Sequence, residues 1–231
     1  MSMTNYLSTL QAEFERHTNS QNAAAQKAYM KDHFEFYGIT APQRKEIQKP
    51  FLLKEHLPPK KDLEKLVKKL WNKQQREHQM FGQELVLKYR KQLEKEDIDL
   101  LEYMVTHKSW WDTVDFIAAN IIGAYFELYP ELRKKYVKKW LTSDHMWLQR
   151  SALLFQLKYK DQLDNELLTY AIRKLLGSKE FFINKAIGWT LRQYSRTNPK
   201  WVIDFVRDTP TLANLSKREA LRLIDQIPHK T

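Results

Sequence analysis

The 231-residue sequence contains no cysteine. Disulfides, thiolate zinc sites and iron–sulfur clusters held by cysteine are therefore excluded, and catalysis by a thiol has no support. Glycine and proline are also scarce, at five and eight residues. This scarcity argues against an all-β protein, because such a protein needs many tight turns.

Long apolar runs are missing as well. No run approaches the roughly 20 apolar residues that a membrane-spanning helix needs. Residues 1–7 lack the basic and apolar regions of a signal peptide. We therefore expect a cytoplasmic protein with no membrane partner, and the absence of cysteine fits a reducing compartment.

Several common catalytic motifs are absent. The chain has no glycine loop to cradle phosphate, no GxSxG and no HExxH. Its histidines are scattered without the spacing of metal ligands: His17, His33, His56, His78, His107, His145 and His229. We expect neither a metal nor a cofactor.

The charge of the chain is strongly positive. Lysine and arginine number 39 against 28 acidic residues, which gives a formal net charge of +11. Such an excess favours a polyanionic partner, above all nucleic acid. An ordinary lysine-rich surface would give the same composition, so charge alone leaves both interpretations open.

Helical signals recur from end to end. Residues 40–43 and 216–219 have the pattern of capping boxes, and Asn198 before Pro199 is typical of a helix start. An apolar stripe at helical spacing is formed by Leu63, Leu66, Val67 and Leu70. We predict an all-α fold of roughly twelve to fourteen helices joined by short turns. No linker divides the chain, so we expect a single domain over residues 1–231.

An internal repeat of 35 residues is visible. Tyr159 and Tyr194 are one step apart and Tyr89 is two steps before Tyr159, whereas the intermediate repeat has Ala124 in register and Tyr125 one residue late. Three more columns keep the step: Met80, Asp115, Arg150 and Lys185; Phe81, Phe116, Ser151 and Ala186; Gly82, Ile117, Ala152 and Ile187. The last two columns should pack between helices, and the polar first column should lie at an exposed edge or groove. A repeat of this length predicts an αα-solenoid, whose concave surface suits a duplex.

Residues 108–115 place two tryptophans beside two carboxylates. On a helix, Trp111 and Asp115 would share one face, an arrangement that suits a cationic, planar target. The alternative is a core tryptophan and an ion pair between Asp115 and Arg150. Similar pairs at helical spacing are Trp147 with Arg150 and Lys185 with Trp189.

The sequence resembles the AlkD family of DNA glycosylases, which are built from HEAT-like helical repeats and excise alkylated purines. The matching blocks cover nearly the whole chain: residues 29–34, 38–44, 108–115, 147–150, 178–189 and 215–220. The resemblance implies a right-handed superhelical solenoid with a concave basic groove. It further implies that the lesion stays largely stacked in the duplex.

The resemblance also implies a set of site residues. Asp115 matches the catalytic aspartate of the family, Trp111 and Trp189 match its cleft tryptophans, and Arg150 matches its cleft arginine. Tyr29 matches an aromatic residue near the same cleft. Further DNA-binding residues are expected at Lys185, Lys217 and Arg218.

The resemblance implies a DNA repair glycosylase that hydrolyses the N-glycosidic bond of cationic N3- or N7-alkylated purines in duplex DNA. A carboxylate at Asp115 would stabilise the oxocarbenium-like sugar and position water. No well-placed lysine supports strand cleavage, so we expect a monofunctional hydrolase that acts as a monomer. The alternative is a noncatalytic solenoid that binds damaged or branched DNA or a protein partner.

Overall fold

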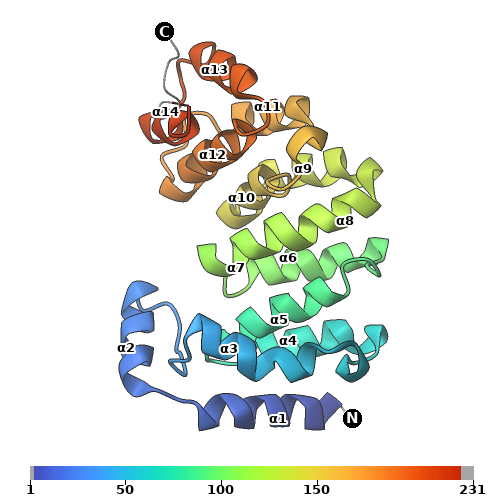
Figure 1. Cartoon of the computed structure of the whole chain (residues 1–231). Helices are drawn as coiled ribbons and strands as arrows, with labels where there is room; N and C mark the ends of the chain where they lie inside the picture. The colour runs from blue at the N-terminus through green and yellow to red at the C-terminus, as the bar shows by residue number, and fades with distance from the viewer. Residues whose placement is uncertain (1–2, 225–231) are drawn as a thin grey trace. The chain divides into compact units, whose positions relative to one another are not determined.

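A computed structural model describes residues 3–224, and all of their regular secondary structure is helical (Figure 1). The fourteen α-helices confirm the predicted all-α fold. The described residues form two compact units, one ending at Glu94 and the other beginning at Lys95. The prediction of a single domain over residues 1–231 stays a prediction. In the described part of the chain, no helix has the length and apolar character to cross a membrane.

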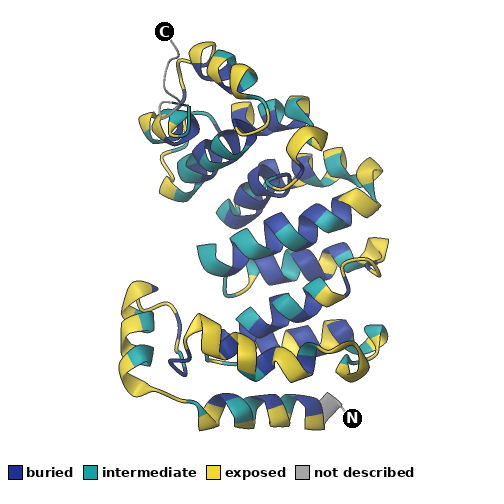
Figure 2. Cartoon of the chain, viewed as in Figure 1, coloured by how far each residue is buried: buried dark blue, intermediate teal, exposed yellow. Residues whose placement is uncertain are grey.

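The first unit contains five α-helices and three short 3-10 helices. They are α1 (Met3–Arg16), α2 (Ser20–Tyr29), α3 (Ala41–Gln48), η1 (Lys49–Leu52), η2 (Lys54–His56), η3 (Lys60–Asp62), α4 (Leu63–Trp71) and α5 (Arg76–Lys88). The predicted stripe of α4 is buried at Leu63, Leu66, Val67 and Leu70. Helix α2, in contrast, contributes no buried residue (Figure 2).

The second unit begins with the 3-10 helix η4 (Lys95–Asp97). Its helices are α6 (Ile98–Thr106), α7 (Trp111–Phe116), the π-helical segment η5 (Ile117–Ile122), α8 (Gly123–Leu128), η6 (Pro130–Leu132), α9 (Arg133–Leu141), α10 (Met146–Leu154), η7 (Lys160–Gln162), α11 (Asn165–Lys174), α12 (Phe181–Tyr194), α13 (Pro199–Arg207) and α14 (Asn214–Leu221). Within this unit, α7–α8, α10, α12 and α14 pack in order as a first layer. Helices α6, α9 and α11 form a second layer against it (Figure 1). This stacking agrees with the predicted solenoid of helix pairs.

One predicted helix start is confirmed and another is wrong. Helix α13 begins at Pro199, and the Asn198 side chain accepts a 3.0 Å hydrogen bond from the Trp201 N–H. Helix α14 begins at Asn214, two residues before the predicted capping serine. Ser216 therefore lies inside the helix, where its hydroxyl donates to a carbonyl of α12 instead of capping.

The start of α3 is intermediate between these two cases. The helix begins at Ala41 directly after Thr40, with Pro42 in its first turn as predicted. The Thr40 side chain makes no capping hydrogen bond, however. Proline, which has no N–H to satisfy and a fixed φ, is sufficient to favour this helix start.

The apolar columns of the 35-residue repeat form the contacts between helices. Phe116 is half-buried, and the remaining members are buried: Phe81, Ser151 and Ala186 in one column, and Gly82, Ile117, Ala152 and Ile187 in the other. The prediction that these columns pack between helices is therefore confirmed, with Phe116 as the exception.

The tyrosine column connects each repeat to the one before it. The Tyr159 hydroxyl donates to the Gly123 carbonyl at 2.7 Å, and Tyr125 donates to the Lys95 carbonyl at 2.8 Å. Tyr125 is one residue late in the repeat because η5 precedes it. A π-helical segment adds one residue to a helix, so the positions that follow it shift by one.

Candidate functional site

The centre of the candidate site is an ion pair between neighbouring helices of the first layer. Arg150 on α10 donates from Nε to Oδ1 of Asp115 at 2.7 Å and from Nη2 to Oδ2 at 2.8 Å. Its Nη1 donates to the carbonyl of Phe182 at the start of α12. One guanidinium therefore connects α7, α10 and α12, and the two-point contact fixes the orientation of the carboxylate.

The two partners differ in their access to solvent. The Arg150 side chain is 4% exposed, whereas the Asp115 side chain is 16% exposed. The polar column was predicted to lie at an exposed edge or groove, and Arg150 departs from this prediction because its side chain is buried. Its guanidinium is enclosed because it lies 5.8 Å from the centre of the Phe182 ring and bonds to two other helices. Part of the Asp115 carboxylate remains accessible.

The acidity of Asp115 reflects two opposing effects. Burial raises the pKa of the Asp115 carboxyl above its ordinary value, and the hydrogen bonds and charge of Arg150 lower it without cancelling the rise. The negative charge of Asp112 adds to the rise. Arg150 favours ionisation of Asp115, but the net pKa is raised because the carboxyl is largely desolvated.

The two predicted tryptophans lie on helices that flank α10. Trp111 is the first residue of α7, and Trp189 lies in α12; both helices contact α10. Both side chains are half-buried, whereas Trp140 on α9 is completely buried in the core. Trp111 and Trp189 therefore retain accessible ring surface, which an ordinary core tryptophan does not.

An aromatic cluster that was not predicted from the sequence surrounds Phe182, the residue whose backbone carbonyl accepts a hydrogen bond from Arg150. The ring centres of Trp110 and Trp147 are 5.7 Å apart, and Phe182 lies 5.3 Å from Trp110 and 5.0 Å from Trp147. These rings hold the residue whose carbonyl accepts from Arg150. Trp147 and Phe182 are one repeat apart, so the 35-residue register could have identified this contact.

A second ion-paired group lies further along the first layer. Lys185 and Arg192 of α12 contact the two oxygens of Glu219 on α14, at 2.6 and 2.7 Å. The helices approach closely because residue 188 is glycine: a Cβ there would lie 2.5 Å from the Cβ of Glu219. Lys185, predicted as a DNA contact, thus shares the single Glu219 carboxylate with Arg192.

The remaining predicted DNA contacts are not drawn together by the described structure. Lys217 is half-buried and donates to the Pro210 carbonyl at 2.8 Å, and Arg218 is exposed on α14. Tyr29 belongs to the first unit, where it is 68% exposed on α2. A role for each of these three residues stays a prediction. The concave basic groove also stays a prediction, because the contacts within each unit do not test it.

Among residues 3–224, no group of three or more His, Asp or Glu side chains is arranged to hold a metal ion. The cation that pairs with Asp115 is Arg150. The arrangement can present a fixed, partly accessible carboxylate on the layer of helices that also carries Trp111 and Trp189.

Comparisons with known proteins identify the family to which the chain belongs. A solved structure described as a predicted DNA alkylation repair enzyme from Enterococcus faecalis is 33% identical to this chain, with a TM-score of 0.83. The match covers 93% of this chain and 98% of that one. The search of curated proteins found no match. A family model described as DNA alkylation repair enzyme matches residues 10–224. The chain therefore belongs to the DNA alkylation repair enzyme family.

Proposed function

We propose that this protein is a monofunctional DNA glycosylase, which hydrolyses the N-glycosidic bond of cationic N3- or N7-alkylated purines in duplex DNA. The observation that carries the proposal is the partly accessible Asp115 carboxylate, held in place by Arg150. Membership of a DNA alkylation repair family supports DNA as the partner. The described residues hold no metal-ligand cluster, and the proposed chemistry requires none.

The chemistry of the lesion explains why a carboxylate suffices. A positively charged alkylpurine is a good leaving group, so its departure requires little or no protonation. As the bond breaks, positive charge develops on the deoxyribose, and a carboxylate fixed nearby stabilises that charge. The same carboxylate can orient the water that attacks the sugar. We assign both roles to Asp115.

Arg150 acts in this proposal mainly as a positioning residue. Its side chain is buried, and its guanidinium donates to Asp115 and to the Phe182 carbonyl. Any contact of Arg150 with a DNA phosphate would have to use the guanidinium hydrogens that remain. Lys185, Lys217 and Arg218 would supply the salt-sensitive affinity for the backbone, which does not depend on base sequence.

Trp111 and Trp189 would contact the lesion nucleotide. The face of an indole ring attracts a cation, and each such contact contributes about 0.5–2 kcal/mol. Both rings are half-buried on helices that flank α10. They would bind the cationic base and the sugar beside Asp115, and the protein would act on the duplex as a monomer.

The experiment that tests the proposal is release of 7-methylguanine from methylated duplex DNA by wild type and by Asp115→Asn. Asparagine keeps the size of the side chain but removes the charge, so we expect a rate loss of about 10²–10³-fold. Intact strands carrying abasic sites should be the product. Equal release by both proteins would remove Asp115 from the chemistry, and no release by wild type would favour a noncatalytic DNA-binding solenoid.

A further inference from the structure

Helix α9 in the second layer has an unusual charge pattern. Its sequence carries five cationic residues and no acidic one: Arg133, Lys134, Lys135, Lys138 and Lys139. Val137, Trp140 and Leu141 are buried, so they define the side that packs into the protein. Lys134, Lys135 and Lys138 are exposed. The helix therefore presents a row of positive charge to solvent.

Two exposed lysines on other helices each pair with a carboxylate of their own helix. Lys68 contacts Glu64 on α4 at 2.6 Å, and Lys200 contacts Asp204 on α13 at 2.6 Å. On α9, Lys134 and Lys138 are instead four residues apart, a like-charge spacing that destabilises a helix. A polyanion bound to this surface would relieve the repulsion.

The positive charge continues onto the adjacent helix. Arg173 and Lys174 are exposed at the end of α11, which contacts α9. Lys138 and Arg173 are one 35-residue repeat apart, so they occupy the same position in successive repeats. We call Lys134, Lys135, Lys138, Arg173 and Lys174 together the α9–α11 basic face.

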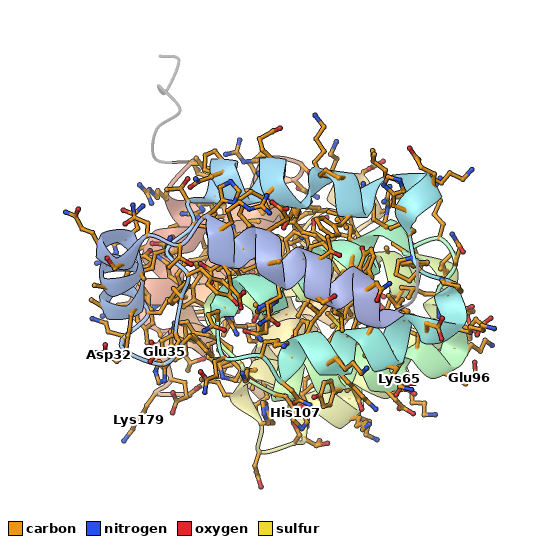
Figure 3. All side chains as sticks on the ribbon, turned by 90° about the horizontal axis from the view of Figure 1, so that it is seen from below. Asp32, Glu35, Lys65, Glu96, His107 and Lys179 are labelled. Carbon is orange, nitrogen blue, oxygen red and sulfur yellow. The ribbon has the colours of Figure 1, made fainter. Side chains whose placement is uncertain are left out.

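The same register carries lysines in the first unit. Lys65 and Lys68 of α4 precede Lys135 and Lys138 by two repeats. Lys65 is exposed, and its side chain projects from the edge of the ribbon (Figure 3). Cations thus occupy the Lys138 position of the repeat in α4, α9 and α11, whereas Tyr103 occupies it in the repeat between α4 and α9.

The first layer differs in this respect. Its cations near the candidate site, Arg150, Lys185 and Arg192, are each paired with a carboxylate. Among the residues that the structure describes, Lys134, Lys138 and Arg173 form no ion pair. Exposed cations without an ion pair therefore lie together on the contacting helices α9 and α11.

We propose that the α9–α11 basic face binds the phosphate backbone of a second DNA duplex, separate from the duplex at the candidate site. The proposal rests on the membership of the chain in a DNA repair family and on charge, and it does not require glycosylase chemistry. Lysine and arginine on neighbouring helices can contact successive phosphates without reading bases. Binding at this face is independent of damage, and it holds the protein on DNA while the site engages another segment.

The proposal predicts that one protein molecule can bridge two duplexes. A donor-labelled and an acceptor-labelled undamaged duplex are mixed with the full chain at about 50 mM salt, where phosphate contacts are strong. Energy transfer between the labels reports bridging, and sedimentation identifies complexes of one protein with two duplexes. The Lys134→Ala/Lys138→Ala/Arg173→Ala variant should lose this complex while it still binds one duplex. Its slope of log affinity against log salt for the second duplex should fall by about 0.9 per lost contact.

The matched control is Lys54→Ala/Lys61→Ala/Lys91→Ala, which removes three exposed lysines that lie outside this face. It should bridge duplexes as wild type does. Absence of bridging by wild type, or equal bridging by the two triple variants, would overturn the proposal. Release of 7-methylguanine is measured on the same proteins and should stay unchanged in both variants. Loss of bridging with release intact thus separates this proposal from the glycosylase proposal.

Discussion

Each unit holds a carboxylate that is largely desolvated, and the two carboxylates are held in different ways. Glu77 at the start of α5 is 1% exposed and accepts hydrogen bonds from the backbone N–H groups of Tyr37, Gly38 and Ile39 at 3.1–3.3 Å. Asp115 accepts two hydrogen bonds from Arg150 and remains 16% exposed. Burial raises the pKa of both groups.

This difference shows that a raised pKa alone does not identify a catalytic acid. Glu77 is closed off from solvent, and its oxygens are occupied by the chain segment that follows α2. That segment includes Gly38, whose φ is +84° and where a Cβ would lie 2.0 Å from the Asn19 carbonyl oxygen. Glu77 is therefore structural. Asp115 combines a fixed orientation with access to solvent, which a reacting carboxylate needs.

Removing Arg150 should have the largest effect on stability. Arg150→Ala leaves the buried Asp115 carboxyl without its cation, and loss of one partner of a buried pair costs about 3–5 kcal/mol. We expect the lower end, because Asp115 is partly exposed. Denaturant unfolding of wild type and variant measures the difference. A loss below about 1 kcal/mol, typical of exposed pairs, would show that the pair contributes little.

The same variant tests the positioning role through pH. Arg150 lowers the pKa of Asp115, so its removal should move the acidic limb of kcat/KM to higher pH. Arg150→Lys keeps the positive charge but not the two-point contact with Asp115. It should therefore shift the acidic limb of kcat/KM by less than Arg150→Ala does. An acidic limb at the same pH in all three proteins would leave Arg150 a purely structural residue.

Glu77→Ala should lower the stability of the protein without slowing cleavage of the N-glycosidic bond. The substitution leaves buried N–H groups of residues 37–39 without an acceptor, which costs about 1–3 kcal/mol. Unfolding measures this loss, and single-turnover base release at saturating protein measures the chemical step. A rate loss as large as that of Asp115→Asn, in folded protein, would contradict the contrast between the two carboxylates.

The raised pKa of Glu77 also predicts how the stability of the protein changes with pH. Its folded-state pKa is raised by burial, so the folded protein takes up this proton more readily than the unfolded chain. The stability contributed by the group is lost as pH rises through the folded pKa. As pH falls from neutral towards 4.5, wild type should therefore gain stability relative to Glu77→Gln. The opposite trend would mean that the N–H donors outweigh desolvation.

The smallest of these effects is expected at the tryptophans. Trp111→Ala removes one aromatic contact to a cationic lesion, worth about 0.5–2 kcal/mol in kcat/KM. Trp189→Ala should be similar, and the corresponding phenylalanine variants should retain part of the activity. Equal losses on a neutral lesion and on 7-methylguanine would exclude attraction to the positive charge as the cause.

Much of the fold followed from local signals in the sequence. The helix start at Pro199 could be predicted because the Asn198 cap and the fixed φ of proline are both local properties. The error at Ser216 came from a contact that is not local: its hydroxyl donates to the Asn184 carbonyl of α12 at 2.8 Å. Such a contact between helices cannot be seen in a four-residue motif.

The ion pair between Asp115 and Arg150 was one interpretation of the sequence, but the burial of Arg150 was not predicted. The 35-residue step placed Asp115 opposite Arg150, and the ion pair was one of two interpretations of that spacing. The sequence did not reveal that Arg150 is enclosed, because this depends on the Phe182 carbonyl and on rings from three helices. Glu77 was missed because it pairs with backbone N–H groups, which leave no mark in the sequence. Glu219 lies 34 residues after Lys185, one residue short of the repeat, so the 35-residue step does not identify this contact.

The most direct test of the account compares single-turnover release of 7-methylguanine across pH for wild type and Asp115→Asn. With an ionised Asp115 as the catalytic group, the wild-type rate should fall as pH is lowered through its raised pKa. Asp115→Asn should be slower by about 10²–10³-fold at neutral pH and should lack that limb. A variant that remains folded, releases base at the wild-type rate and keeps the same acidic limb would contradict the central role of Asp115.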